Sequence, residues 1–246
     1  MRMAATAVLL LLAIPWLACD RGTQKVGNSP DPLLAPGSAR GSNLIWFVID
    51  AQRADHLGCY GYPKDTSPYI DEFAARNVLF SNAMAQETYT QASVPSFFTS
   101  TYPVFHRVLY NHPEIDILAP ELVTIAEILS RESYFSAAFV FNPHLKSKYG
   151  FDQGFDLYDD NPAGFDDSLP RHEKYETARR IHEKVAKLLQ EVSARPIFLY
   201  LHYRDVHSPY VPPPPYHETF FPVGRNPDTE LPLLEKPDRS TVDLHL

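Results

Sequence analysis

Residues 43–62 read NLIWFVIDAQRADHLGCYGY, and this stretch decides the fold class. Its apolar run is continuous, which is typical of a strand buried on both faces of a parallel sheet. Asp50 ends the run, and a charged loop with Gly58 and Gly61 follows at once. A strand that only filled a core would not need a carboxylate at its last position. The pattern therefore predicts a buried strand that delivers Asp50 to the edge of a sheet, where its oxygens suit a hard divalent cation.

Other apolar and amphipathic runs extend this prediction along the chain. The remaining predicted elements are buried strands at residues 134–141 and 196–203, a short strand at residues 77–85, and helices over residues 66–80, 120–133 and 172–195. Strands that alternate with helices indicate an α/β domain with a largely parallel sheet. Ligands of such sheets bind outside the carboxyl ends of the strands. The polar residues that follow the strands are therefore the candidates for a site: Asp50, residues 142–144 and residues 202–207.

The first 42 residues do not look globular. Arg2 precedes an apolar run over residues 4–18, and this predicts a secretory signal peptide, too short for a transmembrane helix. The run ends on Cys19 in the pattern LAC, which predicts a lipobox with Cys19 as the lipidated residue; plain signal cleavage beside an incidental cysteine is the alternative. Residues 20–42 are rich in Gly, Pro, Ser and Asp, and they predict a flexible tether. We therefore expect an exported protein anchored to a membrane of the cell envelope, with its domain over residues 43–246.

Composition excludes one large class of function. The net charge is −8, and no basic stripe with interleaved aromatic residues is present, so a nucleic-acid partner is not expected. The length of 246 residues allows one sizeable domain after the tether. Acidity by itself selects no substrate.

Three stretches resemble the sulfatase family within the alkaline phosphatase superfamily. They are residues 43–62, residues 66–86 (TSPYIDEFAARNVLFSNAMAQ) and residues 202–216 (HYRDVHSPYVPPPPY). The resemblance implies an alkaline-phosphatase-like three-layer sandwich with a divalent metal site, holding Ca, Mg, Mn or Zn. It also implies hydrolysis or transfer at sulfate or phosphate esters, so that the substrate would be a sulfated or phosphorylated glycan, lipid or small molecule.

Two residues, Thr90 and Ser93, are candidates for the position of the nucleophile in the family motif. Sulfatases carry a Cys or Ser, converted to formylglycine, in a Cys/Ser-x-Pro-Ser-x-Arg motif that opens a helix. Residues 88–103 read TYTQASVPSFFTSTYP, and a motif that starts at Ser93 would lack the arginine. A motif that starts at Thr90 lies forty positions after Asp50, as in the relatives, and it resembles the phosphoethanolamine transferases of the same superfamily. Thr90 is therefore predicted as nucleophile and, with Asp50, as a metal ligand.

A threonine in this position changes the expected chemistry. Formylglycine forms from Cys or Ser, so this cofactor is not expected here. A hydroxyl needs a metal or a base to remove its proton, and an anion benefits from a helix N-terminus. The reaction that fits a threonine at this position is phosphoryl transfer through a covalent intermediate on Thr90. The competing interpretation of Thr90 is a plain helix N-cap.

The resemblance also assigns roles to residues after the second and third long strands. Asn142 stands where the family has a lysine that holds the sulfate, so it is expected to bind the substrate, and His144 matches the histidine that follows that lysine and is expected to be catalytic. His207 matches the histidine of the family's His-x-Pro-Tyr loop, which contacts the anionic group or protonates the leaving oxygen. His202 and Asp205 are expected to support the site from behind.

Arg53, in the loop after Asp50, would orient anionic groups of the substrate; pairing with Asp55 is the alternative. The position after Asp50, where many sulfatases place a second acid, is Ala51.

One family motif has no counterpart in this chain. The family completes its metal site with an Asp-His-Gly-like motif beyond the proline-rich loop, and the residues that end at Leu246 do not supply it. The fold is therefore expected to be incomplete at its C-terminal end, and the sequence to correspond to the N-terminal portion, a fragment, of a sulfatase-like hydrolase. The alternative function is a catalytically incomplete envelope lipoprotein that binds anionic glycans or lipids.

Overall fold

A central sheet organises the part of the chain that the computed structural model describes, which is residues 8–10, 37–109, 117–161, 177–192, 195–207 and 216–219. The strand order is β1-β2-β5-β3-β4. The bounds are β1 Val8–Leu10, β2 Leu44–Ile49, β3 Phe135–Val140, β4 Leu157–Asp159 and β5 Ile197–Tyr203. Strands β2, β5, β3 and β4 are mutually parallel, whereas β1, which lies within the predicted signal peptide, is antiparallel to β2. Cys19 and most of the predicted tether lie outside the described residues.

Helices cover both faces of the sheet: α2 Thr90–Thr99 and α4 Ile125–Arg131 pack on one core, and α6 Thr177–Glu191 packs on the other. The remaining described helices are α1 Pro68–Arg76, α3 Pro103–His106 and α7 Tyr216–Thr219. Short 3₁₀ turns lie at Ala54–His56, Gly58–Tyr60 and Ser147–Tyr149. Among the described segments, no helix has the length and apolar character that crossing a membrane requires.

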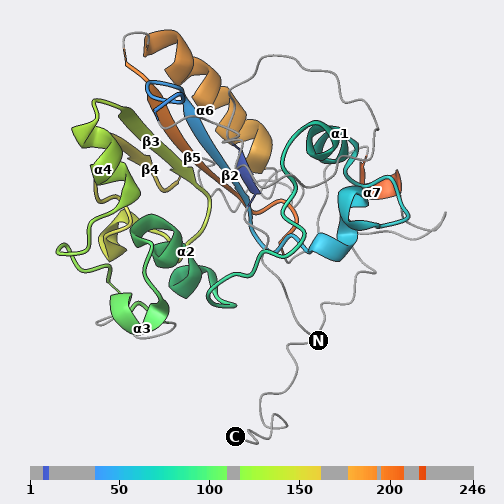
Figure 1. Cartoon of the computed structure of the whole chain (residues 1–246), viewed down its shortest axis with the longest axis horizontal. Coiled ribbons are helices and arrows are strands. Elements are labelled where there is room, and N and C mark those ends of the chain that lie inside the picture. The colour runs from blue at the N-terminus through green and yellow to red at the C-terminus, as the bar shows by residue number, and fades with distance from the viewer. Residues whose placement is uncertain are drawn as a thin grey trace, which may run out of the picture.

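Period-two alternation along β5 separates two hydrophobic cores. Phe198 and Tyr200 belong to the core that α2 and α4 cover, whereas Leu199 and Leu201 belong to the core that α6 covers. Figure 1 shows α6 on one side of the sheet and α2 with α4 on the other. Every residue of β5 is buried, because the strand lies between two neighbours and under helices on both faces. The prediction of a three-layer α/β sandwich with a largely parallel sheet is therefore confirmed.

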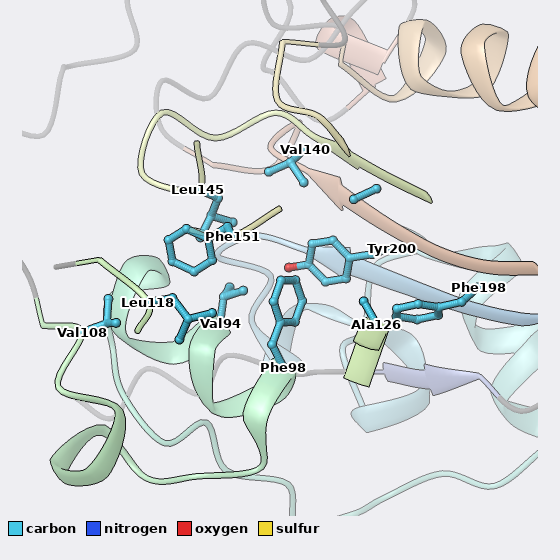
Figure 2. Close-up of a cluster of buried hydrophobic side chains, with 11 residues drawn as sticks. Val94, Phe98, Val108, Leu118, Ala126, Val140, Leu145, Phe151, Phe198 and Tyr200 are labelled. Atoms are coloured by element: carbon cyan, nitrogen blue, oxygen red, sulfur yellow. The ribbon is translucent and has the colours of Figure 1, made fainter. Parts of the chain in front are cut away.

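The core beneath α2 also supports the residues at the sheet edge. Phe98 of α2 packs edge-on against Tyr200, with ring centroids 4.9 Å apart at 81° (Figure 2). Both rings are buried, Phe98 at 2% exposure and Tyr200 at 0%. Because close-packed cores allow little side-chain movement, this contact fixes the height of α2 above the strand and the direction of the tyrosine ring.

Two local predictions are wrong. Residues 77–85 do not form a strand: Val78 is 67% exposed and Phe80 is 53% exposed, so apolar content at this place did not signal burial. The helix expected over residues 120–133 begins only at Ile125. Thr124 accepts a hydrogen bond from the Glu127 N–H, and the Glu127 carboxylate accepts one from the Thr124 N–H. This capping box sets the helix start five residues later than the apolar spacing suggests.

Candidate active site

The parallel register brings the carboxyl ends of three strands to one edge of the sheet. Val48 of β2 pairs with His202 of β5, and His202 pairs with Val140 of β3. Asp50 follows β2 directly, and Asn142 lies two residues beyond the end of β3. Side chains from segments far apart in the sequence therefore meet here.

Asp50 is held as the last paired residue of its strand. Its N–H donates to the Tyr203 carbonyl at 2.9 Å, which continues the parallel ladder by one residue. Ala51 then adopts a φ of 61°, in the left-handed region that non-glycine residues seldom occupy. The chain turns sharply at this point, so the carboxylate of Asp50 stands at the edge of the sheet. Such local strain recurs at functional sites.

Thr90 is the first residue of α2, and its hydroxyl reaches Asp50. Its Oγ1 donates to both carboxylate oxygens, Oδ1 and Oδ2, at 3.3 Å each. The residue before it, Tyr89, occupies the N-cap position without a side-chain capping bond. The hydroxyl of Thr90 therefore serves Asp50 rather than a helix N–H. Ser93, one turn further on, has a buried hydroxyl with no hydrogen-bond partner in the described residues.

Two buried polar side chains, Asn142 and His202, also contact the Asp50 carboxylate. Asn142 Nδ2 donates to Oδ2 at 2.8 Å, and His202 Nε2 lies 3.4 Å from the same oxygen. His202 is 1% exposed, and its Nδ1 lies 3.0 Å from the Tyr200 hydroxyl. An ionised carboxylate only accepts hydrogen bonds, so Nε2–H is the donor to Asp50. A chain of hydrogen bonds thus runs from the core tyrosine through His202 and Asp50 to Thr90.

The environment keeps Asp50 ionised. Burial is the largest single influence and acts to raise its pKa, but the hydrogen bond and charge of protonated His202 oppose it, as do the charges of protonated His207 and of Arg204. Together these partners lower the pKa of Asp50 from 3.8 to about 2. A carboxyl group with this pKa is a good hydrogen-bond acceptor or cation ligand and a poor base.

His144 completes the electrostatic surroundings. Burial lowers the pKa of His144, the charges of Arg204 and of protonated His207 lower it further, and the Asp50 carboxylate partly compensates. Its backbone N–H donates to Asn142 Oδ1 at 2.9 Å. Asp50, Asn142, His144, Arg204 and His207 thus act on one another at a single edge of the sheet.

Arg53 and Asp205 have other immediate partners. Arg53 bonds Asp55 through Nε at 2.9 Å and Nη2 at 2.5 Å, which is the pairing expected of a structural arginine; its contact with a substrate stays a prediction. Asp205 accepts from the Thr177 and Ala178 N–H groups at 3.0 and 3.2 Å, and from the Thr177 hydroxyl. It therefore acts as an anchor of the loop after β5 on the first turn of α6.

A divalent cation would find only some of its ligands here. Hard cations take six or more oxygens, and Asp50 with the Thr90 hydroxyl supplies the oxygens that face each other at this edge. Asn142 turns its NH₂ group toward Asp50, so its amide oxygen bonds the His144 N–H instead. Within the described ranges no group of three or more His, Cys, Asp or Glu side chains is placed to hold a metal. The residues present fit part of a metal site.

Two contributors were given no role from the sequence, although one of them, Arg204, lies in the candidate range 202–207. Tyr200 shares a face with His202 by period-two alternation, and that spacing could have identified it. Arg204 directly follows β5, and the rule that pointed to His202 and His207 covers it equally.

Comparison with known proteins agrees with this architecture. The Sulfatase family profile matches residues 42–241. Iduronate 2-sulfatase of Mus musculus is 26% identical over 269 residues, which is 93% of this chain and 46% of that protein.

Two solved structures share the fold. Phosphonate monoester hydrolase of Agrobacterium radiobacter has a TM-score of 0.53 at 21% identity, over 68% of this chain and 41% of its own. The soluble domain of lipooligosaccharide phosphoethanolamine transferase A from Neisseria meningitidis has a TM-score of 0.50 at 20% identity, over 70% and 48%. The chain thus spans less than half the length of each of these three proteins. With its family motifs in order and their residues at one edge of a parallel sheet, the chain belongs to the sulfatase family.

Proposed function

We propose that the protein is a metal-dependent hydrolase or transferase that acts on sulfate or phosphate esters with Thr90 as its nucleophile. The observation that carries this proposal is the pair of 3.3 Å contacts between Thr90 Oγ1 and the two oxygens of Asp50. They put a hydroxyl at the start of a helix and at the carboxyl edge of a parallel sheet, which is where such folds bind ligands. Membership of the sulfatase family supports an anionic ester as the substrate class.

The proposed reaction has two steps. Thr90 Oγ1 forms a bond to the phosphorus or sulfur atom as the bond to the ester oxygen breaks, and that oxygen leaves with a proton as an alcohol. Water, or the hydroxyl of a second alcohol, then takes the group from Thr90 and restores its hydroxyl. The N-terminus of α2 favours the negative charge of the transferred group.

Asp50 is not the base that activates Thr90. Its pKa is about 2, whereas that of a hydroxyl is near that of water, about 16, so proton transfer between them is strongly unfavourable. Asp50 instead orients the hydroxyl and stays ionised as a cation ligand. A divalent cation, when bound, supplies the positive charge that makes the Thr90 hydroxyl acidic enough to react. Asp50 and Thr90 would hold it together with ligands that the described residues do not supply.

The neighbouring histidines supply hydrogen bonds on the substrate side. His207 and His144 are proposed to donate to the anionic oxygens or to the leaving oxygen. Asn142 holds Asp50 at 2.8 Å and adds no positive charge where many sulfatases have a lysine. Together with a threonine that cannot become formylglycine, this favours phosphate over sulfate esters.

A second candidate function rests on the partial metal site. If the cation ligands stay incomplete, the same edge of the sheet would bind anionic glycans or lipids without turnover. A divalent ion at one equivalent in the purified protein supports the enzyme, whereas no bound ion at millimolar excess supports the binding protein.

The test of the enzyme is a panel of chromogenic esters. The protein, expressed from its complete reading frame, is assayed with p-nitrophenyl phosphate, bis-p-nitrophenyl phosphate and p-nitrophenyl sulfate, each with Mg²⁺, Mn²⁺, Ca²⁺, Zn²⁺ or a chelator. We expect cation-dependent release of p-nitrophenol from a phosphate ester, faster than from the sulfate. Absence of release from all three esters with all four cations would contradict the proposal.

We also propose that Cys19 carries a lipid that anchors the protein in the cell envelope, since the apolar run before it ends in the lipobox-like LAC. Cys19→Ala should move the protein from the membrane fraction to the soluble fraction after cell lysis. An unchanged distribution between the fractions would rule out lipidation at this residue.

A further inference from the structure

Hydrogen bonds to the start of α6 hold the loop that carries His207. Asp205 bonds two N–H groups and the Thr177 hydroxyl at the start of α6, and the Arg204 N–H bonds the Thr177 hydroxyl at 3.3 Å. The His207 N–H in turn donates to the Arg204 carbonyl at 2.9 Å. The backbone from Arg204 to His207 therefore forms a tight turn that is anchored on Thr177. The side chains of Arg204 and His207 leave this turn close to each other.

The contact between these side chains determines where the imidazole carries its proton. Arg204 Nη2 lies 3.0 Å from His207 Nδ1. A guanidinium group has five N–H donors, no acceptor, and stays protonated in proteins. The hydrogen bond therefore exists only if Nδ1 offers its lone pair. The single ring proton of His207 is then on Nε2, at the other side of the ring.

We infer that Arg204 is a positioning residue that holds His207 as the Nε2–H tautomer, so that His207 acts as a hydrogen-bond donor toward an oxygen of the anionic ester. The inference rests on the proposed function for the identity of the ligand, but not for the state of the ring. A donor suits an ester oxygen that gains negative charge in the transition state, whereas a lone pair on Nε2 would repel it.

Arg204 also supplies a positive charge to the site, whereas Asn142, which stands in the place of the family's lysine, is uncharged. The charge of Arg204 lowers the pKa of both Asp50 and His144, so it lies within electrostatic reach of each. A fixed arginine beside the ring keeps positive charge near the anion without a second proton on His207.

Nuclear magnetic resonance tests the tautomer directly. The full protein is labelled with ¹⁵N in its histidine rings, and long-range ¹H–¹⁵N spectra are recorded at pH 7.5; the signals of His207 are those lost in His207→Gln. We expect an Nδ1 signal of an unprotonated nitrogen that accepts a hydrogen bond and an Nε2 signal of a protonated one. Arg204→Met should shift the Nδ1 signal and increase the population of the Nδ1–H tautomer. Arg76→Met, which removes an exposed arginine paired with Glu72, is the matched control and should leave both signals unchanged.

The kinetic test compares kcat/KM of the single variants at Arg204 and His207 with that of the double variant. Arg204→Met should lower kcat/KM by about 100-fold, and the double variant with His207→Gln should be no slower than His207→Gln alone, because the arginine acts through the histidine. Arg204→Lys, which keeps a donor and a charge, should recover part of the loss.

Several results would overturn the inference. They are a proton on Nδ1 in the unmodified protein, an unchanged Nδ1 signal in Arg204→Met, or losses that multiply in the double variant. If Arg204→Met does not fold, the spectrum of the unmodified protein decides, since the tautomer is read from it alone. If the ring is the Nε2–H tautomer but no ester is turned over, the proposed reaction fails while the assignment of Arg204 stands.

Discussion

Thr90→Ala is expected to lower kcat for the ester that the protein turns over by at least about 1,000-fold, because it removes the atom that forms the covalent bond. Thr90→Ser, which keeps the hydroxyl, should retain measurable turnover. The alanine variant should fold normally, since the Thr90 hydroxyl bonds Asp50 and does not cap α2. Release of p-nitrophenol from the best ester of the panel measures the effect.

Two matched variants make this experiment specific. Thr88→Ala removes an exposed hydroxyl that bonds Glu87 two residues before Thr90, and it should leave kcat within a factor of two. Ser93→Ala removes the hydroxyl of the competing motif and should likewise be nearly neutral. Large loss in Ser93→Ala together with normal turnover in Thr90→Ala would reverse the assignment. Mass spectrometry of the protein quenched during turnover should find the transferred group on the peptide that contains Thr90.

Where the sequence predicted this site, it did so through strand ends. Continuous apolar runs marked β2, β3 and β5, and the polar residue after each run lay at the sheet edge because parallel strands end together. Asp50 and Thr90 were paired through the family resemblance, in which the nucleophile lies about forty residues after the aspartate of the metal loop, and the two side chains are in hydrogen-bond contact.

The sequence could not predict which hydrogen-bond partner each polar side chain of the site would have. Asn142 was expected to face the substrate, yet it donates to Asp50, because a buried carboxylate needs donors on every side. Asp205 was expected behind the site, and its contacts are with the N-terminus of α6, far away in sequence. Val78 and Phe80 are exposed, and none of the strands in the described part of the chain pairs with them; an apolar run in the sequence does not reveal whether a partner strand is present.

Asp50→Asn is expected to reduce turnover as far as Thr90→Ala does, for a different reason. Asparagine keeps the shape and an acceptor oxygen for Asn142 and Thr90, but it removes the negative charge. Calorimetric titration with the cation that supports turnover should give binding for the unmodified protein and for Thr88→Ala, and none for Asp50→Asn. Normal cation affinity in Asp50→Asn would show that Asp50 is not a ligand.

The same substitution has a signature in acid stability that needs no substrate. The pKa of Asp50 is lowered from 3.8 to about 2, so its ionised form stabilises the folded protein above pH 3.8, and this contribution is lost as the pH falls from 3.8 toward 2. Without added metal, Asp50→Asn should therefore have a free energy of unfolding lower by about 2 kcal/mol at pH 7, and the difference should disappear near pH 2. Urea unfolding between pH 7 and pH 2.5 measures it, with the exposed Asp65→Asn as control. A difference that does not change with pH would mean that His202, His207 and Arg204 do not hold the charge of Asp50, and the electrostatic basis of the site would be wrong.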